Sequence, residues 1–136
     1  MSFAFAPPAP SVSAATWAIV EAARSWRIAR DTGRSIQPAL YARLEARGCG
    51  LLAPVVDGLL TLFEAGFRRP FQAGNPSDDR ITGDEHRLID LLEGNEAVPA
   101  TDQFRPDLVG AMRVAVRSIR IMLRAMIRPE PNQLEA

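Results

Sequence analysis

The last apolar segment of the chain, residues 113–128 (RVAVRSIRIMLRAMIR), carries an arginine at every third or fourth position. This arginine row consists of Arg113, Arg117, Arg120, Arg124 and Arg128. At about 100° per residue of α-helix, the five side chains fall within an arc of about 80°, while apolar residues cover roughly two-thirds of the circumference. The spacing therefore predicts a long amphipathic helix over residues 106–127, which ends before Pro129.

Four further segments show the same helical period between turn signals, at residues 14–31, 38–47, 54–65 and 83–93. Ser13 is predicted to cap the first of them, and Thr82 with Glu85 forms the capping box of the fourth. The glycines that we expect to end these helices are Gly33, Gly48, Gly66 and Gly94. No segment shows sustained strand alternation, a repeat or a heptad array. The sequence therefore predicts an all-α, single-domain bundle of about five helices.

The chain has 136 residues, a length at which one domain buries roughly two-thirds of its unfolded surface. Residues 1–12 contain three prolines and lack the charged and apolar regions of a signal peptide. We expect a flexible Pro-rich arm over residues 1–12, a helical domain over 13–128 and a flexible tail over 129–136.

The charges balance, with 16 basic and 16 acidic residues, and every basic residue is arginine. This balance removes the global basic excess that draws proteins to nucleic acid without sequence preference, so any such binding has to be local. The single Cys49 forms no internal disulfide and fits a reducing compartment, for which the cytoplasm is our expectation.

The most apolar segment, residues 51–67 (LLAPVVDGLLTLFEAGF), is interrupted by Pro54, Asp57, Gly58 and Glu64. A membrane crossing needs about 20 consecutive residues that are predominantly apolar. We therefore expect no membrane span.

The arginine row has three interpretations. In the favoured one, the arginines pair inside the bundle with Asp57, Glu64, Asp90 or Glu93, so that replacing Arg117 or Arg124 by glutamine lowers thermal stability. In the second, they form a surface about 20 Å long that binds an acidic helix, a polyphosphate or a nucleic-acid backbone. A helix lying on a membrane surface is the third, and the wide apolar arc argues against it because such an arc is typical of a core helix.

A second candidate binding segment is FRRPF, which combines Phe67, Arg68, Arg69 and Phe71 in a long connection. Bases could stack on the two phenyl rings while the arginines hold phosphate. The simpler interpretation, which we favour, is that the phenylalanines pack the connection against the bundle and the arginines face water.

No catalytic or metal-binding motif is present. His86, Asp90 and Glu93 share one helix face at i, i+4 and i+7, and a solvated polar face explains them better than a metal site because no known ligand spacing is met. A tight turn between helices is the simplest role for Cys49, which stands between two glycines. We expect no metal and no cofactor.

The sequence therefore predicts a small helical protein that acts by binding without catalysis of its own, and an enzyme is the third and least favoured option. The wide apolar arc of its last helix indicates self-association or a protein partner. The alternative is an anion or nucleic-acid backbone binder that uses the arginine row, and nucleic acid is the less favoured ligand.

Overall fold

The computed structural model describes residues 13–94 and 103–126, and this part of the chain is helical with no strand. The predicted all-α bundle is confirmed. The five α-helices are α1 (Ala14–Asp31), α2 (Ile36–Glu45), α3 (Ala53–Phe67), α4 (Gly83–Glu93) and α5 (Val109–Met126). Two 3-10 turns, Gly50–Leu52 and Pro106–Leu108, precede α3 and α5. The proposed terminal arms, and Arg128 with them, lie outside the described residues.

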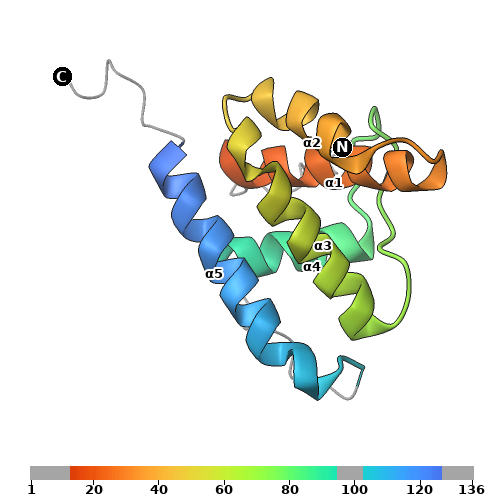
Figure 1. Cartoon of the computed structure of the whole chain (residues 1–136), viewed down its shortest axis with the longest axis vertical. Coiled ribbons are helices and arrows are strands. Elements are labelled where there is room, and N and C mark those ends of the chain that lie inside the picture. Colours follow the sequence, from red (N-terminus) through yellow and green to blue (C-terminus); the bar gives the residue numbers. More distant parts are fainter. Residues whose placement is uncertain (1–12, 95–102, 127–136) are drawn as a thin grey trace, which may run out of the picture.

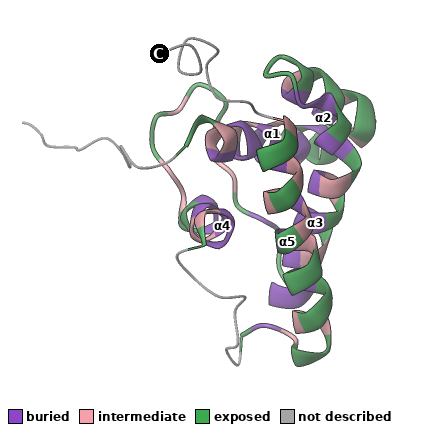
Figure 2. Ribbon diagram, turned by 90° about the vertical axis from the view of Figure 1, so that its left-hand side faces the viewer, coloured by how far each residue is buried: buried purple, intermediate pink, exposed green. Residues whose placement is uncertain are grey.

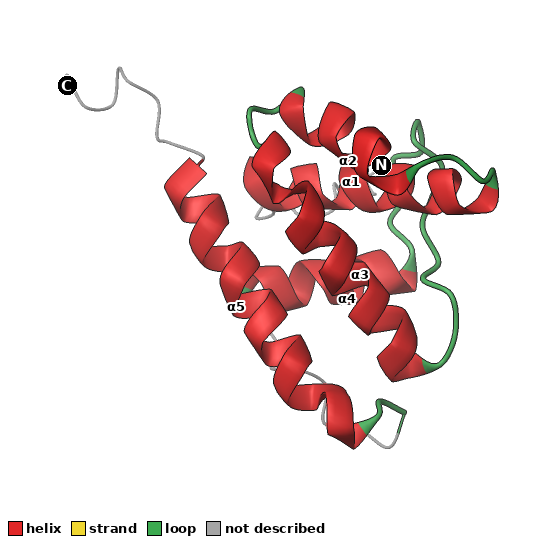
Figure 3. Cartoon of the chain, viewed as in Figure 1, coloured by secondary structure: helices red, strands yellow, loops and turns green. Residues whose placement is uncertain are grey.

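The bundle is built from pairs of neighbouring helices (Figure 1). α1 packs against α2, α3 and α4, and α5 packs against α3 and α4. α5 lies along one edge of the molecule, antiparallel to α3, so that one of its sides is turned away from the other helices. Loops connect the helices, and the longest described loop joins α3 to α4 (Figure 3).

The ends of α1 and α4 lie where the sequence places them, whereas α5 begins at Val109, after the 3-10 turn Pro106–Leu108, and not at residue 106. Ser13 caps α1, because its Oγ accepts a hydrogen bond from the backbone N–H of Thr16 at 3.1 Å. Thr82 and Glu85 form the predicted capping box of α4. α2 begins at Ile36, two residues before the predicted start, and ends at Glu45 instead of residue 47. Boundaries of short helices are the least certain part of such predictions because fraying ends carry weak signals.

The prediction that Gly66 ends α3 is wrong. The helix continues to Phe67, and Arg68 adopts the left-handed conformation with φ of 60°. Gly66 is buried instead, and a Cβ atom there would lie 2.0 Å from Cε1 of Phe104. Its carbonyl accepts a hydrogen bond from the backbone N–H of Arg105 at 2.9 Å. The glycine therefore serves close packing between α3 and the segment before α5.

The core contains the small face of α1 and a cluster of aromatic rings. Trp26 is fully buried, and its indole N–H donates to Oδ1 of Asp57 at 2.9 Å. The ring of Phe67 lies 4.8 Å from that of Phe63 and 5.0 Å from that of Phe104, measured between centroids. Such tilted and edge-on contacts favour a fixed packing arrangement.

The segment Gly50–Phe67 is long and apolar enough to cross a membrane by length and composition, with a mean hydropathy of 1.4. The central helix of a water-soluble bundle meets the same criterion. In this fold the segment is α3 with its preceding turn, and it packs against α1, α2 and α5.

Three carboxylates hold the loop between α3 and α4: Glu64, Asp84 and Glu85. Glu85 is fully buried and forms a bidentate ion pair with Arg24 of α1. The Arg24 Nε–H donates to Oε2 at 2.8 Å, and Nη2–H donates to Oε1 at 3.0 Å. It also accepts the backbone N–H groups of Gly74 and Thr82. Asp84 pairs with Arg69 at 2.6 and 2.7 Å.

The guanidinium of Arg24 extends the same network to the far end of the loop. It donates to the backbone carbonyls of Asp78 and Arg80, both at 2.8 Å. Glu64 of α3 accepts the backbone N–H of Phe71 at 2.7 Å. The loop is thus fixed to α1, α3 and α4 by charged hydrogen bonds, which are stronger than neutral ones.

We expect Gly66→Ala to lower the free energy of unfolding by about 1 to 3 kcal/mol, because the new methyl group overlaps the Phe104 ring. Gly58→Ala is the matched control, since Gly58 is an exposed glycine of the same helix with nothing near its missing Cβ. That change should raise stability by about 0.5 to 1 kcal/mol. Urea titration measures both, and equal effects of the two substitutions would contradict the packing role of Gly66.

We expect Glu85→Gln to lower stability by about 3 to 5 kcal/mol at pH 7, because it leaves Arg24 as a buried charge without its partner. The contacts with Arg24 and two backbone N–H groups outweigh burial and hold the pKa of Glu85 below its ordinary value of 4.5. Because the pKa of Glu85 is lower in the folded state, its carboxylate adds to the free energy of unfolding above about pH 4.5. This contribution disappears as the pH falls through the folded-state pKa of Glu85.

Melting temperatures of wild type and Glu85→Gln between pH 3 and pH 7 check this linkage. The gap between the two proteins should be largest near neutral pH and should narrow below about pH 4.5. A gap that stays constant over this range would show that Glu85 does not act through its charge.

Candidate protein-binding face

Three arginines of the row lie on the exposed side of α5. Arg113, Arg117 and Arg124 are exposed, and Arg120 is half-buried. The Arg120 guanidinium lies against Gly94, where a Cβ atom would be 2.9 Å from Nη2. Gly94 is the C-cap of α4, and a cation near that end offsets the partial negative charge of the helix C-terminus. The structure therefore gives Arg120 a place inside the fold and leaves the other three at the surface.

The predicted internal pairing of the row is wrong for the residues that the structure describes. Arg113, Arg117, Arg120 and Arg124 form no ion pair with any described carboxylate.

The four expected partners are engaged elsewhere. Asp57 accepts from Trp26 and from Gln37. Glu64 pairs with Arg27 of α1, with Nη1 and Oε2 separated by 2.7 Å. Asp90 lies 4.0 Å from His86, and Glu93 accepts from the Thr16 hydroxyl at 2.6 Å. The physical reason is that side chains of α1, namely Trp26, Arg27 and Thr16, already bind three of these carboxylates.

Beside these arginines, the side of α5 that faces away from the bundle carries a mainly apolar strip. The residues that contact the core are Met112, Val116, Ile119 and Leu123, all buried. On the opposite side, Val114 is 64% exposed and Ile121 is 56% exposed. In Figure 2, α5 lies toward the viewer, and exposed turns occur along its length. We call the residues Ala111, Val114, Ser118, Ile121 and Ala125 the outward face, and Arg117 and Arg124 lie along one of its edges.

The FRRPF segment contributes no aromatic surface. Phe67 is 8% exposed as the last residue of α3, and Phe71 is fully buried. Neither ring presents a free face for a base in this structure. Arg69 is bound to Asp84, and Arg68 is exposed at the end of α3. This placement matches the interpretation in which the phenylalanines pack the connection against the bundle.

The face with His86, Asp90 and Glu93 is divided in the structure. The His86 side chain is 67% exposed and lies near Asp90, whereas Glu93 turns to Ser13 and Thr16 at the start of α1. Among the described residues, no group of three histidine, cysteine or acidic side chains could hold a metal ion. The prediction that the protein holds no essential metal is not tested by this arrangement.

Cys49 lies in the tight turn that the sequence predicts. Its side chain is fully buried, and the thiol donates to the backbone carbonyl of Leu44 at 3.4 Å. Burial raises the pKa of the Cys49 thiol, with the Glu45 carboxylate acting in the same direction. A raised pKa keeps the thiol protonated near neutral pH, which is the opposite of a reactive cysteine.

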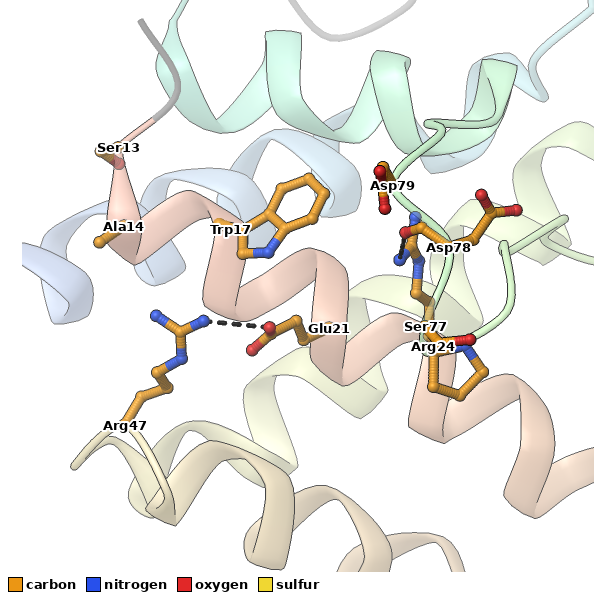
Figure 4. A pocket seen from close by; sticks show the side chains of 10 residues that line it. Ser13, Ala14, Trp17, Glu21, Arg24, Arg47, Ser77, Asp78 and Asp79 are labelled. Atoms are coloured by element: carbon orange, nitrogen blue, oxygen red, sulfur yellow. Dashed lines mark hydrogen bonds and ion pairs between the residues drawn. The ribbon is translucent and has the colours of Figure 1, made fainter. Parts of the chain in front are cut away.

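A cleft of about 620 Å³ opens between α1 and residues 76–79 (Figure 4). Trp17 lies at its centre, and Glu21 closes one side through a 3.0 Å ion pair with Arg47. The Arg24 guanidinium reaches its other side, 5.5 Å from the Trp17 ring centroid. Arg24 and Arg47, which line the cleft, are both bound to acidic groups.

No protein-family model, curated protein or solved structure matches this chain. The candidate site rests on the geometry of α5 alone.

Two parts of this geometry were missed by the sequence analysis. The first is the buried pair of Arg24 and Glu85, since nothing distinguishes Arg24 from the other arginines of the first helix by spacing. The second is the outward face, because α5 has apolar residues on two opposite sides and periodicity does not say which one faces the core. The exposed Val114 and Ile121 were visible in the sequence as residues beside the arginine row.

We expect Arg117→Gln and Arg124→Gln to leave the free energy of unfolding within about 0.5 kcal/mol of wild type, because both side chains are exposed and make no ion pair with the described residues. Arg27→Gln is the matched comparison, since it removes the closer of the two ion-pair partners of Glu64 and should cost about 1 to 3 kcal/mol. Thermal melting of the three variants checks the difference. A drop of similar size at Arg117 or Arg124 would restore the internal-pairing interpretation.

Proposed function

We propose that this protein is a small, non-catalytic binding protein that docks a partner protein on the outward face of α5. The observation that carries the proposal is the exposure of Val114 and Ile121 at the centre of a face edged by Arg117 and Arg124. Large aliphatic side chains that are more than half exposed, next to arginines that pair with no described carboxylate, are typical of a docking surface.

The aliphatic centre favours a protein over a nucleic-acid backbone. A phosphate backbone can form ion pairs with the arginines but makes no favourable contact with Val114 and Ile121. A protein partner can bury both kinds of side chain. The chain as a whole carries no net charge, so it provides no long-range attraction to a polyanion. An anion or nucleic-acid backbone binder is the alternative function on the same arginines.

The apolar arc that motivated self-association is mostly covered by the bundle. Met112, Val116, Ile119 and Leu123 are buried, and what remains exposed is the narrower outward face. A second copy is therefore the second choice of partner, and a different protein with acidic groups is the first.

The double variant Val114→Glu, Ile121→Glu tests the proposal. Its partner should be lost in affinity purification from the native cells and in reconstitution with the purified partner, while its melting temperature stays close to wild type because both positions are exposed. Tyr41→Glu, Leu51→Glu is the matched control, since it alters two exposed apolar residues away from α5 and should keep the partner.

Light scattering coupled to size exclusion gives the second measurement. Wild type should elute near the monomer mass of 14.9 kDa in the absence of its partner. A dimer that dissociates in the α5 double variant would make a second copy the partner. A purified partner that binds the α5 double variant as well as wild type would contradict the proposed face.

A further inference from the structure

The outward face of α5 has the spacing of a coiled-coil seam. Its residues, Ala111, Val114, Ser118, Ile121 and Ala125, follow one another at intervals of three, four, three and four. An interval that averages 3.5 residues keeps one line of side chains facing a partner helix. The seam covers 15 residues, and its 14 steps give a rise of about 21 Å. The sequence alone did not reveal it, because the buried residues form a second apolar line on the other side.

The sizes of these side chains suit one neighbouring helix. In heptad terms, the a positions are Ala111, Ser118 and Ala125, and the d positions are Val114 and Ile121. Small residues at alternate positions let another helix approach to about 8 to 10 Å between axes. The two aliphatic side chains then insert between the side chains of the partner, as in knobs-into-holes packing.

The charges beside the seam define the partner further. Arg117 and Arg124 both stand at the flanking position just before the seam residues Ser118 and Ala125, where coiled coils carry the charges that select a partner. α5 contains no acidic residue, so neither arginine has a carboxylate within its own helix. The opposite flank carries Ala115 and Met122, which are half-buried. A matching helix therefore needs acidic side chains on the edge that meets the two arginines.

A second copy of α5 matches this seam poorly. In an antiparallel pair, Arg117 of one copy would face Arg124 of the other, and like charges repel. In a parallel pair, Arg117 would face Met122, which forms no ion pair. A helix with acidic flanks can form ion pairs with both Arg117 and Arg124, whether it lies parallel or antiparallel to α5.

We propose that the outward face of α5 binds a single amphipathic helix with acidic flanks from another protein, in coiled-coil packing of about two heptads. This inference rests on the proposed function, and it adds the secondary structure and the charge of the partner. Arg117 and Arg124 select the acidic edge of that helix, and Val114 and Ile121 provide the buried contact.

The test uses a labelled synthetic peptide of three heptads with leucine at both seam positions and glutamate at both flanking positions. Repulsion between its own glutamates opposes pairing of the peptide with itself at neutral pH. The same peptide with lysine in place of glutamate is the matched probe. We expect the full-length protein to bind the glutamate peptide at low salt about tenfold or more tightly than the lysine peptide, as two ion pairs allow.

Three variants locate the contact. The double variant Arg117→Gln, Arg124→Gln should weaken binding about tenfold and flatten its salt dependence. Ile121→Asp should abolish binding with an unchanged melting temperature, since Ile121 is exposed. Arg113→Gln removes the same charge from the same helix away from the seam edge, and it should change affinity by less than about threefold.

Several outcomes would overturn the inference. These are equal binding of the two peptides, no binding of either, or binding that persists in Ile121→Asp. Binding of inorganic polyphosphate that depends on the arginines and not on Ile121 would indicate an anion surface instead. If neither peptide binds but Val114→Glu, Ile121→Glu still loses the purified partner, the proposed function stands and the acidic-helix inference falls. If that variant keeps the partner, the proposed function falls with it.

Discussion

The buried ion pair between Arg24 and Glu85 is the contact on which most of the remaining structure depends. It joins α1 to the start of α4, and the same two side chains hold four backbone groups of the loop, at Gly74, Asp78, Arg80 and Thr82. A buried charge without its partner costs several kcal/mol, so this arrangement ties the loop to one position. The capping box of α4 uses the same Glu85, which couples the start of that helix to α1.

This network explains how the bundle accommodates a long polar connection. A loop packed against a core carries backbone N–H and C=O groups that need partners, and here Glu64, Asp84 and Glu85 supply acceptors for three of the N–H groups, at Phe71, Gln72 and Gly74. Phe71 then anchors the loop in the core. The arginines of α1 neutralise Glu64 and Glu85. Among the described residues, these two carboxylates are therefore not paired with the arginines of α5.

The arginines of this protein therefore divide by location. Those of α1 are bound to carboxylates and contribute to stability, as Arg24 and Arg27 show. Those on the exposed side of α5 have no such partners among the described residues, and they stand beside an apolar face that the bundle does not use. The same residue type has two roles because the packing of α1 decides which acidic groups are within reach.

The sequence by itself determined the number of helices, the ends of α1 and α4 and the arginine row, because capping residues and the helical period are local signals. It also indicated that Phe67 and Phe71 pack inward. The tertiary structure decided the role of Gly66, whose close contact with Phe104 comes from a segment almost 40 residues away. It decided the partners of Glu64 and Glu85, and it decided which apolar side of α5 faces water. Those outcomes depend on which helices become neighbours, and a local pattern does not contain that information.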